Sequence, residues 1–536
     1  MLQALPLATE RELELVLLGV LVAVSLLLLL AYHASIPYPL LLVVGGAGIG
    51  FLPGVPDVTL EPELVLVLVL PPLLYAAAFF SSLRDLRDNL RAISLLAIGL
   101  VIATTVGVAI VAHAVIDGMS WQAAFVLGAV VSPTDPVAAT AIASRIGAPR
   151  RFVTIIEGES LINDATALVA YKFAVAAVVT GSFSMAEAGG RFVLNVAAGI
   201  AIGLAVGWLV AQVRRAIDDP PTEIAVSLVT PFFAYLPAEA LDVSAVLAVV
   251  TAGIFLGWRS PQLITPATRI QAFAVWEIVQ FVLNAVLFVL VGLQLPSVLD
   301  GISDLATGTI VLYAAVVCLA VIVVRFLWVF PATYLPRLLS ARIRNSEPSP
   351  SWQYPAIVGW TGMRGAVSLA AALAIPETID SGAPFPQRDL IIFLTYAVIM
   401  VTLLVQGLTL PGVLKALGVE EDGTMAQRES KARLLAARAA IDRIGELVGE
   451  DWVREDTAQR LRQSYEFRIR RFSARFDDTD DGAIDERSYA FQRLRREVLE
   501  AERAAIIQLR NQGRINDEIM HRIERDLDLE DTRLEV

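Results

Sequence analysis

Charge is scarce in the first 414 residues of this chain, and that scarcity constrains the fold more than any other feature. Only 45 of these 414 residues are Asp, Glu, Lys or Arg, about 11%, against 51 of the last 122, about 42%. Soluble proteins average about 25% charged residues, and apolar runs of roughly 16 to 27 residues, the length of a membrane helix, fill the first part. The sequence therefore predicts an all-α polytopic membrane domain over residues 1–414 and a soluble, helical C-terminal tail over 415–536.

The apolar runs, cut at proline, glycine and charge clusters, divide into about thirteen expected membrane helices. They lie near residues 13–33, 38–53, 63–80, 90–113, 121–144, 151–179, 191–213, 222–237, 243–258, 270–295, 308–335, 353–375 and 389–413. Every second loop is rich in arginine, whereas the intervening loops carry only Arg191 and Arg388 as basic residues. Because cytoplasmic loops hold the excess of basic residues, we expect the N-terminus outside the cell and the tail in the cytoplasm.

Composition excludes several classes of function. A single cysteine, Cys318, cannot build a disulfide framework or a thiolate metal site. The lysines are never preceded by glycine, which excludes a phosphate-binding P-loop, and a net charge of −12 does not suggest nucleic-acid binding. We therefore expect no cofactor and no nucleic-acid partner.

The first of two unusual polar segments lies inside the fifth expected helix, at residues 131–137. Two prolines flank Thr134 and Asp135 there, and because proline lacks an N–H and clashes with the preceding turn, we expect the helix to open. Broken backbone at membrane depth survives only when it is buried in protein or lines a watery cavity. The freed carbonyls, the hydroxyl and the carboxylate could ligate a hard cation. Alternatively, the segment is a structural kink in which the aspartate caps the second half-helix.

The second polar segment begins the sixth expected helix. At helical spacing Ser160 and Asp164 are neighbours one turn apart, and Glu159 and Asn163 are related in the same way. Asp164 is expected to lie deepest, among apolar residues. Loss of water there raises the pKa of its carboxyl group toward the range in which it can take up and release protons. An alternative reading, a polar cluster that caps the helix N-terminus at the membrane interface, explains Glu157 better than Asp164.

Two arginines far along the chain are also expected within spans. Arg325 lies in an apolar run and could pair with Glu159 or another buried carboxylate, or could extend its side chain to the cytoplasmic surface. Arg364 lies among three glycines in residues 359–365, which weaken a helix. That segment is in the twelfth span and the proline-flanked one is in the fifth, so each is fifth of six in its half of the domain. Matched broken helices in two inverted six-helix repeats are typical of secondary transporters.

Two further patterns lie on other expected spans. On the tenth span, polar residues at helical spacing are interpreted as hydrogen-bonding contacts between helices; they are Glu277, Gln280 and Asn284. On the seventh span, glycine recurs every fourth residue at Gly199, Gly203 and Gly207, which indicates close helix packing, either within one protomer or between two.

In their order along the chain, three motifs resemble the sodium–proton exchanger branch of the monovalent cation–proton antiporters: Ser132–Pro136, Glu157–Asp164 and Gly362–Gly365. The resemblance covers about residues 12–413. It implies thirteen spans, a homodimer and an elevator-like movement of a core domain that carries the site. It also implies a multi-pass protein of a bacterial plasma (inner) membrane, in contact with membrane lipid.

The resemblance further implies a role for each residue of the cation site. Asp164 would be the carboxylate that exchanges a proton for a cation, and Asn163 its neutral partner, typical of electroneutral members. Thr134, Asp135 and Ser160 would help to line the site. The bound Na⁺ or K⁺ would be held at Asp164, Thr134 and Ser160.

The resemblance assigns a structural role to three further residues. Glu159 would form an ion pair with Arg325, and Arg364 would be a further structural charge that stabilises the crossing of the broken helices. The sequence departs from many relatives at Ala76, where they carry a glutamate after Pro-Pro-Leu-Leu. A carboxylate ligand used by some members is therefore missing, which leaves the choice between Na⁺ and K⁺ open.

These observations predict a secondary transporter, not an enzyme, that exchanges protons one for one with monovalent cations. Na⁺ is the first expected substrate and K⁺ the second, in pH and cation homeostasis. The alternative from another class is a monovalent cation channel gated by the tail. An intramembrane hydrolase is disfavoured because Ser160 and Asp164 have no nearby histidine and no GxSxG motif. The tail is a candidate regulatory domain, and Asp477–Gly482 is interpreted as a solvated acidic linker.

Overall fold

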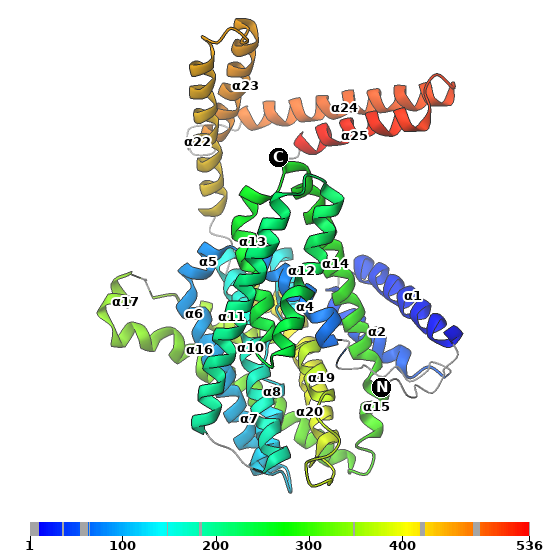
Figure 1. The fold of residues 1–536 in the computed structure, drawn as a ribbon, viewed down its shortest axis with the longest axis vertical. Coiled ribbons are helices and arrows are strands. Elements are labelled where there is room, and N and C mark those ends of the chain that lie inside the picture. The colour runs from blue at the N-terminus through cyan, green and yellow to red at the C-terminus, as the bar shows by residue number, and fades with distance from the viewer. Residues whose placement is uncertain are drawn as a thin grey trace. The chain divides into compact units, whose positions relative to one another are not determined.

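A computed structural model describes residues 10–34, 37–53, 63, 65–146, 148–181, 185–346, 349–418, 424–474 and 483–534, and every named element in these ranges is a helix (Figure 1). The chain divides into two compact units, Met1–Glu420 and Glu421–Val536. The division falls later than the expected boundary at 414/415, because helix α21 (Gly407–Ala416) continues past that point.

The first unit contains all the long apolar helices. Its first half comprises α1 (Glu10–Ala34), α2 (Tyr38–Gly50), η1 (Val65–Val69), α4 (Leu70–Phe80), α5 (Leu83–Asp88), α6 (Leu90–Ser94), η2 (Leu95–Leu100), α7 (Val101–Val115), α8 (Trp121–Val130), α9 (Pro136–Ile146), α10 (Arg150–Thr180) and α11 (Met185–Arg215). The remainder comprises α12 (Pro220–Ala240), α13 (Ala245–Leu263), α14 (Pro266–Leu293), α15 (Leu295–Asp300), α16 (Thr307–Leu339), α17 (Ala341–Ser346), α18 (Gln353–Trp360), α19 (Ala366–Leu373), α20 (Arg388–Val401), η3 (Thr402–Gln406) and α21.

Several helices begin where the sequence supplies a capping side chain. A helix leaves its first N–H groups without a partner, and a Ser, Thr or Asp side chain can accept from one of them. Among the described residues of the unit, five accept in this way from the N–H three positions later: Ser82, Ser120, Asp219, Ser244 and Thr265. These caps fix the starts of α5, α8, α12, α13 and α14.

The polytopic membrane character expected from the charge distribution is confirmed. Among the described residues, seven helices are long and apolar enough to cross a membrane, and four shorter apolar helices accompany them. The expected fifth and twelfth spans are shorter because each is interrupted: α8 stops at Val130 before α9, and α18 stops at Trp360 before α19. The number of thirteen spans and the inverted repeat stay predictions.

The two interruptions meet in space. The main-chain N–H of Asp135 donates to the carbonyl oxygen of Met363 at 2.9 Å, and the Arg364 Nε donates to the carbonyl oxygen of Val131 at 2.7 Å. Buried backbone groups outside a helix need such partners, because water is absent at that depth. Each unwound segment thus supplies partners for the other.

The glycine pattern of α11 packs against α13 within the same chain. A Cβ at Gly203 or Gly199 would collide with the carbonyl oxygen of Ala248 or Ser244, and a Cβ at Gly207 would meet the ring of Phe255. Small residues at such positions let two helix backbones approach closely. This settles the alternative left by the sequence, since these glycines serve packing inside one protomer.

Two separate clusters of buried apolar side chains form the interior of the first unit. One joins α4 with α11, α12 and α13 and with Trp276 of α14; the other joins α2, α7, α8, α9 and the helices from α14 onward, and α10 contributes to both. The cavity described below lies where these two clusters meet.

The second unit contains four helices, α22 (Thr424–Leu447), α23 (Glu455–Ala474), α24 (Ala483–Asn511) and α25 (Asp517–Leu534). Helices were expected from the apolar periodicity within 429–449 and 484–510, and α22 and α24 cover those segments apart from the last two residues of the first. α24 and α25 pair through charged side chains, among them Arg503 and Asp528 at 2.6 Å. The expected acidic linker Asp477–Gly482 lies outside the described residues.

Candidate functional site

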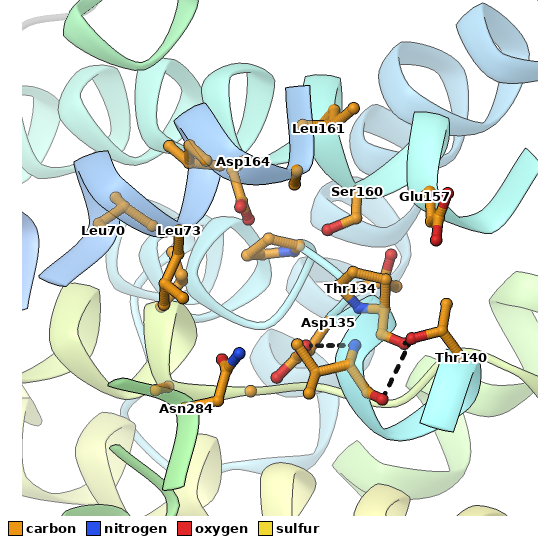
Figure 2. Close-up of a pocket in the computed structure, with 18 of the residues that line it drawn as sticks. Leu70, Leu73, Thr134, Asp135, Thr140, Glu157, Ser160, Leu161, Asp164 and Asn284 are labelled. Carbon is orange, nitrogen blue, oxygen red and sulfur yellow. Dashed lines mark hydrogen bonds between the residues drawn. The ribbon is translucent and has the colours of Figure 1, made fainter. Parts of the chain in front are cut away.

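A cavity of about 320 Å³ lies beside the interruption of the fifth expected span (Figure 2). Apolar side chains of α4, including Leu70 and Leu73, form one wall. Polar side chains of α9, α10, α14, α19 and the first unwound segment are interspersed among apolar ones around the rest of the cavity. The polar residues that line the cavity are Ser81, Thr134, Asp135, Thr140, Glu157, Ser160, Asp164, Gln280, Asn284 and Ser368.

Asp164 of α10 directs its carboxylate into this cavity (Figure 2). Its side chain belongs to a residue only 6% exposed, and it accepts no hydrogen bond from any residue that the structure describes. Ser160 lies one turn earlier on the same face of α10 and lines the same cavity. A buried carboxylate without a protein donor is costly as a free charge, which favours binding of a proton or a cation.

Asp135 lines the cavity and also caps a helix. Its Oδ1 accepts from the N–H of Val137 at 2.8 Å, at the start of α9. The capping interpretation from the sequence therefore describes a real contact, and it coexists with a position on the cavity wall. A Cβ at Gly365 would overlap the Asp135 carboxylate, so the second broken segment approaches this close only because it has glycine there.

Glu159 forms a fully buried ion pair with Arg325. The Arg325 Nη1 donates to Oε1 at 2.6 Å and Nη2 donates to Oε2 at 3.0 Å, and each side chain is 1% exposed. The Arg325 Nε donates to the carbonyl oxygen of Val358 at 3.1 Å. Such a bidentate contact is among the strongest that arginine makes. The alternative in which Arg325 extends to the cytoplasmic surface is wrong.

Thr134 connects this ion pair to the wall of the cavity. Its hydroxyl donates to Glu159 Oε1 at 3.0 Å and accepts from the Asn163 Nδ2 at 2.7 Å. Asn163 is 1% exposed and lies behind the cavity wall rather than on it. Of the five residues expected at the site, the structure therefore brings Thr134, Asp135, Ser160 and Asp164 to the cavity, and holds Asn163 in the layer behind.

Arg364 is fully buried and contacts carbonyl oxygens. Besides its bond to Val131, its Nη1 donates to the carbonyl oxygen of Gly362 at 2.6 Å, and its main-chain N–H donates to Thr402 Oγ1 at 3.1 Å. The resemblance placed Arg364 with the structural ion pairs, and this is corrected: in the described part of the chain its guanidinium pairs with no carboxylate and donates to backbone carbonyl oxygens. It fastens the two unwound segments together.

The position of Ala76 also needs correction. Ala76 is fully buried in the apolar cluster of α4 and α13, whereas the next residue, Ala77, lines the cavity. One residue along a helix turns the side chain by about 100°. The absence of a glutamate at 76 therefore removes no ligand from the cavity wall as this structure has it.

Two cavity residues, Gln280 and Asn284 of α14, were interpreted from the sequence as contacts between helices. Their side chains instead line the cavity across from α10, and Asn284 is labelled in Figure 2. The signal that could have identified them was present, since polar residues one turn apart in an apolar span often face a functional cavity.

Comparisons with known proteins agree with this geometry. Residues 19–416 match the family described as sodium/hydrogen exchanger, transmembrane. An uncharacterized Na⁺/H⁺ exchanger of Mycobacterium tuberculosis (strain ATCC 25618 / H37Rv) is 40% identical over 97% of this chain and 96% of its own length. The sodium, potassium, lithium and rubidium/H⁺ antiporter of Bacillus pumilus is 37% identical over 78% of this chain and 63% of its own.

A solved structure shares the fold. The sodium proton antiporter MjNhaP1 of Methanocaldococcus jannaschii superposes with a TM-score of 0.59 at 20% identity. The match covers 76% of this chain and 99% of that one. At this identity the likeness concerns the fold alone.

The Glu159–Arg325 pair predicts a specific pattern of stability. Arg325→Met leaves a carboxylate buried without its partner, and breaking a buried pair costs about 3–5 kcal/mol. We expect the melting temperature of the purified protein to fall sharply in Arg325→Met and to recover in part in the double variant Arg325→Met/Glu159→Gln. The matched comparison is a second fully buried pair among the described residues, Arg214 with Glu223 at 2.9 Å, treated in the same way. A double variant as unstable as the sum of its single variants would contradict the pairing.

Proposed function

Because the chain belongs to the sodium/hydrogen exchanger family, we propose that its membrane unit exchanges protons for monovalent cations through the cavity around Asp164. The family match spans nearly all of the membrane unit, and relatives that cover most of this chain are named as antiporters. The protein is a secondary transporter and not an enzyme. The alternative of a tail-gated channel has no support from these relatives.

The observation that carries the mechanism is the buried carboxylate of Asp164, which lies on the cavity wall and accepts no hydrogen bond from the described residues. An unneutralised charge is expensive to carry through a low-dielectric interior. The carboxylate can cross that barrier once a proton or a cation has neutralised it. Since the two compete for one group, a gradient of either drives the movement of the other.

The cation would be held by oxygen atoms around Asp164. Ser160 Oγ lies one turn away on α10, and the amide oxygens of Gln280 and Asn284 lie across the cavity. The Thr134 hydroxyl already donates to Glu159 and accepts from Asn163, so it retains one lone pair for a cation. Hydroxyl, amide and carboxylate oxygens suit hard cations such as Na⁺ and K⁺.

Na⁺ is the proposed first substrate, with K⁺ as a second. The Bacillus pumilus relative is named for sodium, potassium, lithium and rubidium, which supports a site of broad selectivity. Of the three described carboxylates that line the cavity, Asp135 caps α9 and Glu157 is partly exposed, whereas Asp164 is buried without a hydrogen-bond donor. A single carboxylate with several neutral oxygens sets a weak size preference.

We propose that alternating access occurs by movement at the boundary between the two apolar clusters. The cavity is lined by Leu70 and Leu161 from one cluster and by Leu287 and Ala366 from the other. Contacts between apolar side chains are not directional, so one cluster can slide against the other at low cost. The proposal also includes a homodimer, in which each protomer makes an elevator-like movement. It places the protein in a bacterial plasma membrane, with the N-terminus outside the cell and the C-terminus in the cytoplasm.

The Asp164 assignment predicts complete loss of exchange on removal of the carboxylate. In everted membrane vesicles with a pH-sensitive dye, Asp164→Ala should abolish proton movement driven by added Na⁺ or K⁺. Asp88→Ala, which removes an exposed carboxylate of α5, is the matched control and should exchange as the parent does. If Asp164→Ala still shows cation-dependent proton movement, Asp164 is not the carboxylate that exchanges protons for cations.

The proposed stoichiometry predicts insensitivity to voltage. One proton against one monovalent cation moves no net charge, whereas each uncompensated charge would couple about 2.3 kcal/mol per 100 mV to the cycle. The motivating observation is the neutral Asn163 directly before Asp164. A potential imposed with valinomycin across proteoliposomes should leave the rate of Na⁺/H⁺ exchange unchanged, and a rate that follows the potential would contradict one-for-one exchange.

A further inference from the structure

Glu157 of α10 lies where the cavity of Asp164 meets a second cavity. The second cavity has a volume of about 400 Å³ and is bounded by the end of α4, by α5 and by the start of α10. Three residues line both cavities: Phe80, Ser81 and Glu157. The two spaces therefore adjoin at Glu157, with α5 on the far side of the second cavity and Asp164 on the wall of the first.

The polar residues of α10 form a row that begins at this junction. Glu157, Ser160 and Asp164 follow one another at intervals of three and four residues, which places them on one face of the helix. Seven residues of helix span about 10.5 Å along the axis. All three line the first cavity, and Figure 2 shows them in this order along the helix.

Helix capping does not account for Glu157. The cap position of α10 is Pro149, and the first turn of the helix holds no acidic residue. Glu157 lies about two turns further on, where the main-chain N–H groups already bond within the helix. The capping interpretation considered from the sequence is therefore wrong for this residue.

The charges around Glu157 favour a cation at the junction. The other charged residues of the second cavity are Arg150 and Asp85, which approach one another at 3.8 Å at the exposed end of the cavity, and Arg150 also acts on Glu157 as an opposite charge. Glu157 is half-buried and accepts no hydrogen bond from the described residues. A carboxylate in a narrow, partly apolar passage concentrates the field that a cation experiences.

We propose that Glu157 is a second, outer cation-binding residue of the transporter. It receives the monovalent cation from the cytoplasmic side, beside the Phe80 ring, and hands it along the α10 row to Ser160 and Asp164. This proposal rests on the proposed exchange function and on the proposed orientation, with the loop at α5 in the cytoplasm. Glu157 determines the apparent affinity for cytoplasmic cations, whereas Asp164 carries out the exchange of cation for proton.

Transport measured from each face of the membrane tests this proposal. In everted vesicles the added cation reaches the cytoplasmic face, and in right-side-out vesicles it reaches the outer face. Glu157→Gln should raise the KM for Na⁺ about five- to tenfold in everted vesicles, as expected for loss of one nearby partly screened charge. The maximal rate and the KM in right-side-out vesicles should stay close to those of the parent.

Two control variants separate a binding role from general effects. Glu157→Asp keeps the charge at the junction and should keep the KM near that of the parent. Asp88→Asn removes an exposed carboxylate of α5 that lines neither cavity, and should also leave the KM unchanged. Protein abundance in the vesicles, measured by immunoblot, corrects the rates for any loss of folded protein.

The outcomes distinguish the proposed role of Glu157 from the proposed antiporter function on which it rests. An unchanged KM in Glu157→Gln, with exchange intact, overturns the role of Glu157 and leaves the antiporter function standing. An equal rise in Asp88→Asn, or a rise confined to right-side-out vesicles, also overturns it. A parent protein that exchanges no cation for protons in either vesicle type overturns the proposed function instead.

Discussion

The crossing of two unwound segments inside the membrane unit is the constraint on which the remaining structure depends. Backbone N–H and carbonyl groups that leave a helix at membrane depth must find partners, because water is absent there. Here Asp135 donates through its N–H to Met363, and Arg364 spans the gap to Val131. The same unwinding places Pro133, Thr134 and Asp135 on the wall of the cavity that Asp164 lines.

The crossing also explains why charged residues are tolerated so deep in the unit. The Glu159–Arg325 pair neutralises itself and anchors Thr134 of the first unwound segment. The glycines of the second segment make the room, since a side chain at Gly362 would collide with Arg325. Asp164 is then left as a carboxylate whose compensation must come from the cavity, and this is the property that an exchanger needs.

Features with local causes could be predicted from the sequence. Flanking prolines open the helix at Asp135, and a buried arginine in an apolar run needs a carboxylate, which Glu159 supplies. Features set by helix rotation or by distant packing could not. Whether Ala76 or Ala77 faces the cavity, and whether Asn163 lies on its wall or behind it, depends on how α4 and α10 are turned against their neighbours. Periodicity alone leaves that rotation open.

The central claim is that one carboxylate, Asp164, holds either a proton or a cation. Calorimetric titration of the purified protein with NaCl, in buffers of different ionisation enthalpy, counts the protons released for each Na⁺ bound. The account predicts up to one proton per cation, a count that falls toward zero as rising pH removes the proton beforehand, and no proton release coupled to cation binding in Asp164→Asn. Cation binding that releases no proton at any pH where exchange operates would contradict it.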